Sequence, residues 1–457
     1  VNVLQASVLI ANRGEIAGRV IRSCRLLGLK SVAVYSEADK DLSYVTEADT
    51  AIAIGPGPAS QSYLKIDTII KAAQSSGCDA IHPGYGFLSE NAEFAQAVMD
   101  TGICWIGPRP ETIKAMGDKN QARIIAAKAG VPIIPGSERF ETGSIKNISN
   151  AAQTIGFPLL VKASAGGGGI GMKRVDTLEQ LVPIAEATQS MALRTFGDGS
   201  IFLEKFIPWA RHIEIQVFGF GNGLAVHMYE RDCSIQRRFQ KIIEESPAPG
   251  LDATVQKKMA DAAINLCRVT NYSGAGTVEF ILNTEAQTFY FLELNTRIQV
   301  EHPVTELVTG LDLVGMQIQH AFGNLETLDQ EMISTTGHAI ECRLYAENPA
   351  KSFLPSPGTL RRFRLPTNNH NVRIDTSYCE GDTIPHYYDP MIAKLIFNGT
   401  KREIARQRAI EALKGMEIDG VYTNLNFLIA CLEHTDFIAE NVHTNFVDLH
   451  IKELVNI

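Results

Sequence analysis

The chain of 457 residues lacks the features that mark several classes of protein. Its eight cysteines include no Cys-x-x-Cys pair, which argues against a zinc ribbon or a redox dithiol, and its eleven histidines lack the spacing of metal ligands. It has no apolar run long enough to cross a bilayer and no signal peptide. We therefore expect reduced thiols, no membrane partner and a cytoplasmic location, or a mitochondrial or plastid one if a transit peptide was removed.

Net positive charge is also missing, since 42 lysines and arginines face 51 aspartates and glutamates and the formal net charge is -9. A field of that sign disfavours binding to nucleic acid, so we expect no such partner. Hydrophobic residues make up 45% of the chain and charged residues 20%, which is an ordinary globular balance. The length predicts two or three domains.

The order of apolar runs divides the chain into three expected regions. Residues 1–117 alternate strands (8–11, 31–35, 80–82 and 104–106) with helices (16–27, 68–75 and 92–101), which predicts a Rossmann-like α/β domain with a mostly parallel sheet. Residues 118–206 begin with a helix at 119–129 and continue as a small mobile lid lobe, with strands at 159–163 and 172–175. Residues 207–457 predict a large α+β C-terminal domain, with helices at 253–269 and 402–414.

A glycine-rich segment, Ser164 to Met172, joins the two strands of the lid lobe and carries five glycines in six successive positions. Glycines let a backbone approach a ligand closely and direct several N–H groups at one anion. A flexible hairpin turn is the alternative, but a hairpin needs only two turn residues. We predict a mobile flap over phosphates, with the ammonium group of Lys162 beside it.

The most informative stretch runs from Glu293 to Glu301. If it is extended, every second side chain shares one face, namely those of Glu293, Asn295, Arg297, Gln299 and Glu301. A solvated edge strand would alternate in the same way, but this run contains no lysine and follows a strongly apolar segment. The run is therefore expected to begin inside the fold.

A hairpin just upstream places a second carboxylate on this face. Its strands are expected at 277–282 and 288–294, and a register centred at residue 286 sets Glu279 opposite Glu293. Directly opposed carboxylates repel each other, and a divalent cation removes the conflict. Asn295 adds an oxygen ligand, and oxygen-only ligation suits Mg²⁺ or Mn²⁺ bridging phosphates.

Further along the same face, Arg297 and Gln299 are expected to meet a small oxyanion, and Glu301 is expected to act as a base. A metal, a cation clamp and a base are the parts that phosphoryl transfer requires. Two other stretches stay open. Residues 204–207 could read an adenine edge or form a salt-bridged strand end, and the basic run 231–241 could be a solvated face or a positive pocket for anionic substrates.

Motifs spread over nearly the whole length resemble those of the biotin carboxylases, which are ATP-grasp enzymes. They are Ile10–Ala17, His82–Glu90, Met116–Lys119, the glycine-rich segment, Glu230–Ser234, Glu293–Glu306 and Tyr387–Pro390. The resemblance implies an ATP-grasp fold and the carboxylation of biotin by ATP and bicarbonate through carboxyphosphate. It also implies Mg²⁺ or Mn²⁺, a biotin carboxyl carrier protein or domain, a carboxyltransferase component and a homodimer.

The resemblance assigns a role to each matching position. For ATP the positions are Lys119, Lys162, Gly166, Gly167, Gly168, Gly169, Glu204, Lys205, Ile207, His212 and Gln236, and for the metal they are Glu279, Glu293 and Asn295. For bicarbonate they are Lys241, Arg297, Gln299 and Val300, with Glu301 as the base. Arg343, which spacing alone does not single out, matches the arginine that holds the biotin ureido oxygen, and Asp389 lies near that site in relatives.

Two positions depart from the family pattern. Phe239 stands where many relatives carry a histidine, and Ile170 replaces a basic residue in the glycine-rich segment. The form of that segment resembles urea-type carboxylases, so the final acceptor, whether an acyl-CoA, pyruvate or urea, stays open. No Ala-Met-Lys-Met carrier motif occurs, so biotin is expected on another chain or domain. The alternatives are an ATP-grasp ligase that joins a carboxylate to an amine without biotin, and a nucleotide-binding regulator without catalysis.

Overall fold

The computed structural model describes residues 6–164 and 171–455. Its N-terminal sheet has five parallel strands in the order β3-β2-β1-β4-β5. They are β1 (Ser7–Ile10), β2 (Lys30–Ser36), β3 (Thr50–Gly55), β4 (Ala80–His82) and β5 (Cys104–Trp105). The four strands predicted from the sequence, β1, β2, β4 and β5, are confirmed. The edge strand β3 was not predicted, although residues 51–54 form a short apolar run; most of its residues are exposed or half-buried at the edge of the sheet.

The helices of this region are α1 (Gly14–Leu26), α2 (Ser43–Glu47), α3 (Ile66–Ser75) and α4 (Ala92–Asp100). Helix α4 begins where it does because the Asn91 side chain accepts the backbone N–H of Phe94, which satisfies one of the free donors of the first turn. The predicted Rossmann-like domain is confirmed.

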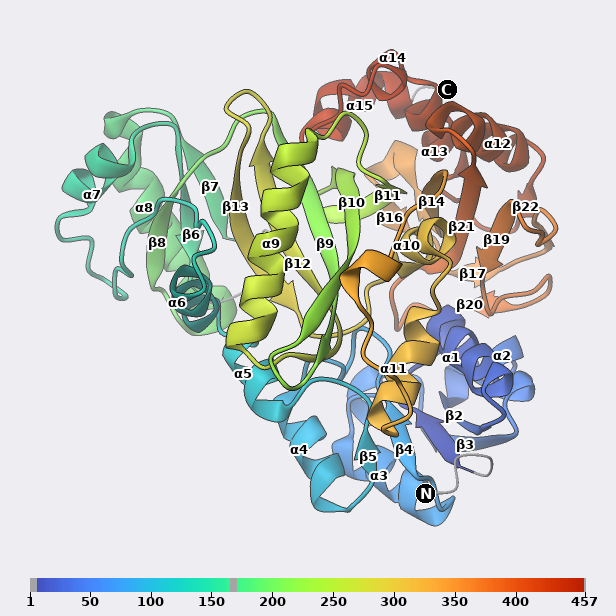
Figure 1. The fold of residues 1–457 in the computed structure, drawn as a ribbon. Coiled ribbons are helices and arrows are strands. Elements are labelled where there is room, and N and C mark those ends of the chain that lie inside the picture. The colour runs from blue at the N-terminus through green and yellow to red at the C-terminus, as the bar shows by residue number, and fades with distance from the viewer. Residues whose placement is uncertain (1–5, 165–170, 456–457) are drawn as a thin grey trace.

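Helices α5 (Pro110–Gly117) and α6 (Lys119–Lys128) lead to a small lobe that projects from one side of the molecule (Figure 1). Its antiparallel sheet β7-β6-β8 consists of β6 (Leu159–Ala163), β7 (Met172–Val175) and β8 (Ile201–Lys205), and α7 (Ile148–Ile155) and α8 (Leu178–Phe196) share its apolar core. Both strands predicted here are confirmed. The glycines predicted to form a flap, Gly166 to Gly169, and Ile170 lie outside the described residues.

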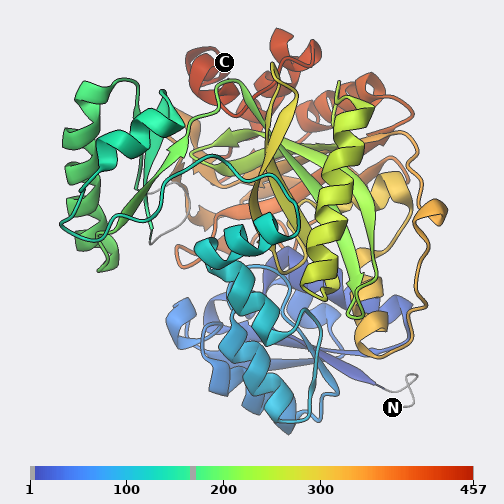
Figure 2. The same cartoon turned by 60° about the vertical axis from the view of Figure 1, so that its left-hand side comes forward.

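An eight-stranded antiparallel sheet forms the centre of the molecule, in the order β13-β12-β9-β10-β11-β14-β21-β19. Its strands are β9 (Ala210–Phe220), β10 (Ala225–Arg237), β11 (Gln240–Ser246), β12 (Ser273–Asn283), β13 (Thr288–Asn295), β14 (His338–Tyr345), β19 (Val372–Asp375) and β21 (Met391–Gly399). Helix α9 (Ala253–Val269) packs on β9 and β10, and α10 (His302–Thr309) packs on β10, β11 and β14. Figures 1 and 2 show the lid lobe and the N-terminal domain meeting this sheet from different sides.

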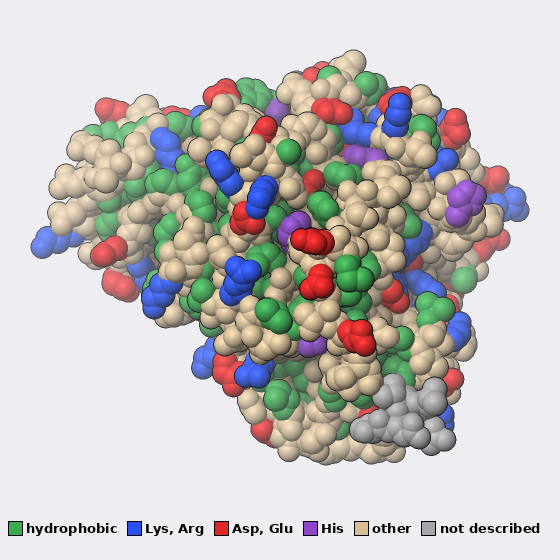
Figure 3. Space-filling view, in the orientation of Figure 1, with side chains coloured by type: hydrophobic (Ala, Val, Ile, Leu, Met, Phe, Trp, Pro, Cys, Tyr) green, Lys and Arg blue, Asp and Glu red, His purple; other side chains and the backbone are tan. Residues whose placement is uncertain are grey.

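Smaller elements complete the C-terminal region. They are α11 (Leu313–Ala321), β15 (Glu347–Asn348), β16 (Leu354–Pro355), β17 (Gly358–Thr359), β18 (Arg362–Arg364), β20 (Thr383–Ile384), α12 (Arg402–Lys414), β22 (Glu417–Asp419), α13 (Leu425–Glu433), α14 (Thr435–Ile438) and α15 (Phe446–Val455). The helices predicted at 253–269 and 402–414 are confirmed. Within the described part of the chain, the helices are too short or too polar to cross a bilayer. Acidic and basic side chains are interspersed on the face in Figure 3.

Buried ion pairs join α1 to the C-terminal region. Arg19 donates to Glu306 at 2.8 Å and to Asp312 at 2.6 Å. Arg373 donates to the other carboxylate oxygen of Glu306 at 2.6 Å. Arg19 is 6% exposed and Glu306 is 7% exposed, and charges at such positions have to be paired. The N-terminal domain is thus attached to the helix that follows the polar run.

We expect Arg19→Met to lower the free energy of unfolding by about 1.5–3 kcal/mol, the range for a hydrogen bond to a charged group, because Arg373 still pairs with Glu306. Urea denaturation followed by fluorescence measures this loss. Arg25→Met, at an exposed position of the same helix, is the matched control and should change the free energy by less than about 0.5 kcal/mol. Equal losses in the two variants would contradict a stabilising role for the buried pair.

Candidate active site

Three glutamates lie side by side across three neighbouring strands. Glu214 of β9 is in register with Glu279 of β12, which is in register with Glu293 of β13. The predicted opposition of Glu279 and Glu293 is confirmed, although a bulge between Glu279 and Phe280 shifts the register by one residue nearer the turn. Glu214 was not predicted, although it alternates with His212 and Gln216 along β9, a spacing that could have placed it on the same face as His212.

Lys241 of β11 pairs with two members of this row and with Glu301. Its Nζ donates to Glu214 at 2.6 Å and to Glu279 and Glu301 at 2.7 Å each. Burial lowers the pKa of Lys241, but the three carboxylates raise it more strongly, so its pKa lies well above the usual range. The ammonium group therefore stays charged, and it holds Glu301 next to Glu279.

The two opposed carboxylates have different surroundings. Glu279 is 5% exposed, and His212 Nε2 lies 2.9 Å from its Oε2. Burial raises the pKa of Glu279, but Lys241 and His212 lower it more, and the net shift is downward. Solvent reaches Glu293, yet desolvation by the surrounding protein and then the charge of Glu279 raise its pKa. A divalent cation would relieve this repulsion, and carboxylate oxygens are suitable ligands for it.

Asn295 and Gln299 complete the surroundings of Glu279. Asn295 Nδ2 and Gln299 Nε2 each donate to Glu279 Oε1 at 2.9 Å. Arg297 donates to Asn295 Oδ1 at 3.0 Å and to Gln299 Oε1 at 2.8 Å. On its other side, Arg297 donates to Glu90 of the N-terminal domain at 2.9 Å. The structure thus brings these residues into one hydrogen-bonded group. Glu90 also belongs to this group, although its spacing in the sequence did not indicate that.

The extended run predicted from Glu293 to Glu301 is wrong beyond Asn295, where β13 ends. The following residues leave the sheet, and Glu301 precedes α10 with φ -82° and ψ 8°. Pro303 in the first turn favours the start of this helix, and Ile298 is fully buried. Alternation along β13 accounts for the positions of Glu293 and Asn295, whereas the residues after Asn295 contribute to the site from outside the sheet.

Glu301 is fully buried and bonded at both oxygens. Its Oε1 accepts from Lys241 at 2.7 Å and its Oε2 from Arg343 at 2.9 Å. Burial raises the pKa of this carboxyl, but the cations Lys241, Arg343 and Arg231 lower it more, to well below its usual range. Arg343 also lies 2.6 Å from Glu244, another acid that the sequence did not single out.

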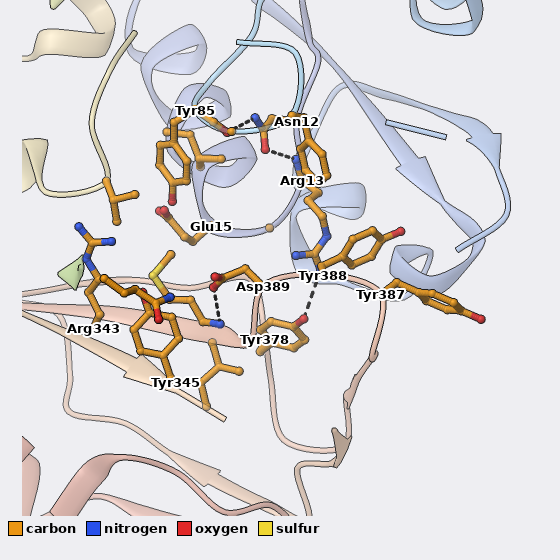
Figure 4. A pocket seen from close by; sticks show the side chains of 18 of the residues that line it. Asn12, Arg13, Glu15, Tyr85, Arg343, Tyr345, Tyr378, Tyr387, Tyr388 and Asp389 are labelled. Carbon is orange, nitrogen blue, oxygen red and sulfur yellow. Dashed lines mark hydrogen bonds between the residues drawn. The ribbon is translucent and has the colours of Figure 1, made fainter. Parts of the chain in front are cut away.

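A cavity of about 480 Å³ opens beside Arg343, between the N-terminal domain and the C-terminal region. Figure 4 shows Tyr85, Arg343 and Asp389 around this cavity. Val300 also lines it, and the fully buried Lys394 fixes this loop by donating to the Val300 carbonyl at 2.9 Å. The cavity gives a second molecule access to Arg343 and, through it, to Glu301.

The residues predicted for the nucleotide lie at the junction of the lid lobe and the large sheet. Glu204 at the end of β8 meets Lys162 at 2.6 Å and Arg123 at 2.7 Å. The salt-bridged strand end considered from the sequence is therefore present. Lys205 donates to two backbone carbonyls of the lobe at 3.2 Å each, which directs its side chain into the lobe.

Other predicted nucleotide residues surround this junction. Lys119 begins α6 and lines a cavity of about 250 Å³ with Ser164, which lies two positions before Gly166 in the sequence. Gln236 is in register with Lys241, and Ile207 is buried just beyond β8. Phe239, which departs from the family pattern, is 61% exposed at the tip of the β10–β11 hairpin.

Three family models match consecutive parts of the chain. The biotin carboxylase N-terminal domain matches residues 5–113, the carbamoyl-phosphate synthase L chain ATP-binding domain matches 118–330, and the biotin carboxylase C-terminal domain matches 341–449. Biotin carboxylase 1 of Bacillus subtilis is 48% identical over 446 residues, which cover 97% of this chain and 98% of that protein. The alpha subunit of mitochondrial methylcrotonoyl-CoA carboxylase from Rattus norvegicus is 47% identical, and the match covers 98% of this chain but only 62% of that protein.

A solved structure agrees with these relatives. The biotin carboxylase domain dimer of Hydrogenobacter thermophilus 2-oxoglutarate carboxylase, in complex with MgADP, ADP and bicarbonate, has a TM-score of 0.91 and 41% identity and covers 98% of both chains. The ATP-grasp fold expected from the sequence is confirmed. Nearly half of the residues of this chain are identical to those of a biotin carboxylase, over almost the full length of both proteins. The chain therefore belongs to the biotin carboxylase family.

Proposed function

We propose that this chain uses ATP to carboxylate biotin with bicarbonate, as the first half-reaction of a biotin-dependent carboxylase. The observation that carries the proposal is the fully buried Glu301 held between Lys241 and Arg343, beside the opposed acids Glu279 and Glu293. Hydrogen bonds join Glu279 to Glu301 through Lys241, and Glu293 lies opposite Glu279 on the neighbouring strand, so the groups proposed as base, anion-binding cations and metal ligands lie close together. The relative named biotin carboxylase and the neighbour in complex with MgADP and bicarbonate support the same chemistry.

For Mg²⁺ or Mn²⁺ we propose Glu279 and Glu293, with Asn295 as a third ligand. The raised pKa of Glu293 beside Glu279 is the conflict that such an ion removes. Asn295 would ligate through Oδ1, which now accepts from Arg297. The bound ion supplies neutralisation of charge on the phosphate oxygens. Lys119 and Lys162 bring further positive charge to these oxygens.

In the proposed first step Glu301 takes the proton of bicarbonate. A bicarbonate oxygen then attacks the γ-phosphorus of ATP, the bond to the β-phosphate oxygen breaks, and carboxyphosphate and ADP form. Lys241, Arg297 and Gln299 hold the bicarbonate oxygens, with Val300 beside them, and stabilise the negative charge that develops.

In the second step the carbon–oxygen bond of carboxyphosphate breaks to give carbon dioxide and phosphate. The phosphate takes the ureido N–H proton of biotin, and the nitrogen attacks carbon dioxide. The guanidinium group of Arg343 donates to the ureido oxygen and stabilises its negative charge while the proton is absent. The cavity beside Arg343 is the entrance that we assign to biotin.

We infer a biotin carrier protein or domain and a carboxyltransferase component as partners, and a homodimer as the assembly. The chain spans only part of the methylcrotonoyl-CoA carboxylase subunit that it matches, and the structural neighbour is described as a domain dimer. We also infer a reducing compartment such as the cytoplasm, because all eight cysteines are unpaired.

Bicarbonate-dependent ATP hydrolysis stimulated by free biotin is the expected activity. In this assay Glu301→Gln should lower the rate at least about 10²-fold, because general-base catalysis contributes that much and glutamine cannot accept the proton. ADP affinity, measured by calorimetry, should stay unchanged because Glu301 does not contact the nucleotide in the proposal. Arg297→Ala should raise the Michaelis constant for bicarbonate in the same assay.

The matched control is Glu285→Gln, at an exposed position of the β12–β13 turn, which should behave as wild type. Full activity of Glu301→Gln would contradict its role as the base. ATP hydrolysis that does not respond to biotin would overturn the proposed function and favour the carboxylate–amine ligase.

Removing one of the opposed acids should weaken metal binding. We expect Glu293→Gln to reduce the affinity for Mn²⁺ in the presence of ADP by at least about tenfold. Even mutation of a residue that only hydrogen-bonds to a metal ligand typically reduces metal affinity about 10–100-fold. Electron paramagnetic resonance of free Mn²⁺ measures the binding. Wild-type affinity in this variant, with Glu285→Gln as the control, would exclude Glu293 as a ligand.

A further inference from the structure

Two histidines and an aspartate that the catalytic proposal does not use lie together among the C-terminal helices. His434 precedes α14, Asp436 lies within α14, and His450 lies within α15. One ligand atom from each residue lies within 4.8 Å of the other two. Spacing along the chain did not indicate this group, because α15 returns His450 to the side of α14 only after an intervening loop. The histidines that lack metal-ligand spacing along the chain are therefore close in space.

Two of the separations between candidate ligand atoms lie within about half an ångström of those around a small tetrahedral ion. Asp436 Oδ2 lies 3.0 Å from His450 Nε2 and 3.9 Å from His434 Nδ1. Zinc bonds of about 2.0–2.2 Å place neighbouring ligand atoms roughly 3.3–3.6 Å apart, so small side-chain shifts would complete the geometry. The three side chains are partly exposed, so that an ion can enter from solvent.

His434 has the tautomer that ligation requires. Its Nδ1 accepts the backbone N–H of Asp436 at 3.1 Å, so this nitrogen carries a lone pair and no proton. Its Nε2 then carries the proton and lies 3.5 Å from Glu453 Oε2. Histidines that bind metals usually donate their other N–H to a carboxylate, and a small movement of the exposed Glu453 side chain would form that hydrogen bond. Metal binding at Nδ1 would exchange the hydrogen bond for a metal bond.

Neighbouring residues hold the other ligands in place. Asn441 Nδ2 donates to Asp436 Oδ1 at 3.3 Å, and the other oxygen, Oδ2, faces the two histidines. The rings of His434 and His450 have centroids 4.1 Å apart, and the ring of Phe446 lies 5.1 and 5.2 Å from them. Two protonated imidazoles at this separation would repel each other, whereas a metal ion binds them in the neutral form.

We propose that His434, Asp436 and His450 bind one divalent ion of the zinc class, such as Zn²⁺, Co²⁺ or Ni²⁺, with water as the fourth ligand. Two imidazole nitrogens and one carboxylate favour these ions over Mg²⁺, which prefers oxygen ligands. The other groups of metal-ligand type found among the described residues both include Glu214 of the active site, where the Lys241 ammonium group already neutralises the carboxylates. The ion would link α14 to α15.

The test is titration of the tag-free full chain with Co²⁺, followed by visible absorption, and with Zn²⁺, followed by calorimetry. Saturating Mg²⁺ and ADP keep the catalytic acids occupied. The expected result is one ion per chain, with affinity reduced at least tenfold in His450→Gln and in Asp436→Asn. His370→Gln, at an exposed histidine outside this group, is the matched control and should bind as wild type.

Circular dichroism and thermal melting establish that each variant is folded. Asp436 is partly exposed, so Asp436→Asn should fold and keeps the test valid if His450→Gln does not fold. Zn²⁺ should raise the melting temperature of wild type and of His370→Gln but not that of the two ligand variants. An absence of binding to wild type, or unchanged affinity in the folded ligand variants, would overturn the proposal.

Discussion

The active site depends on one enclosed ammonium group. Lys241 allows Glu214, Glu279 and Glu301 to stay ionised within hydrogen-bonding distance of a single atom. Removing a charge from water costs several kcal/mol per ion, and attraction offsets this only when the geometry is good and the remaining lone pairs are bonded. Contacts of 2.6 and 2.7 Å supply that geometry. Without the ammonium group the three carboxylates would repel, and at least one of them would take up a proton.

A second cation determines where the base lies relative to the acids. Arg231 of β10 is fully buried, pairs with Glu214 and donates to Thr277 of β12 and Thr305 of α10. It therefore links the sheet that carries the opposed acids to the helix that begins after Glu301. Because the arginine is bonded on both sides, a shift of α10 would break hydrogen bonds inside the sheet. The position of the base is thus coupled to the register of the strands.

Local patterns in the sequence predicted most elements of the N-terminal domain and the hairpin with the opposed acids, whereas long-range contacts decided the rest of the site. The opposition of Glu279 and Glu293 could be predicted because strand side chains alternate and a short turn limits the register. The bulge that lies between this pair and the turn could not be predicted from the sequence pattern. The strand predicted beyond Asn295 was wrong because the start of α10 outweighs alternation. Arg343 and the position of Glu214 beside Glu279 could not be found from spacing, since both depend on pairing of strands that are distant in sequence.

The same ion pairs restrict when Glu301 can act as a base. A base works best when its pKa lies near the operating pH, yet Lys241 and Arg343 hold the pKa of Glu301 well below its usual range. These two cations are also the groups proposed to hold bicarbonate and the biotin ureido oxygen. Burial opposes this shift, so the low pKa of Glu301 depends on the two ion pairs. Any substrate contact that weakened one of these ion pairs would raise the pKa of the buried carboxyl toward the operating pH and make it a better base.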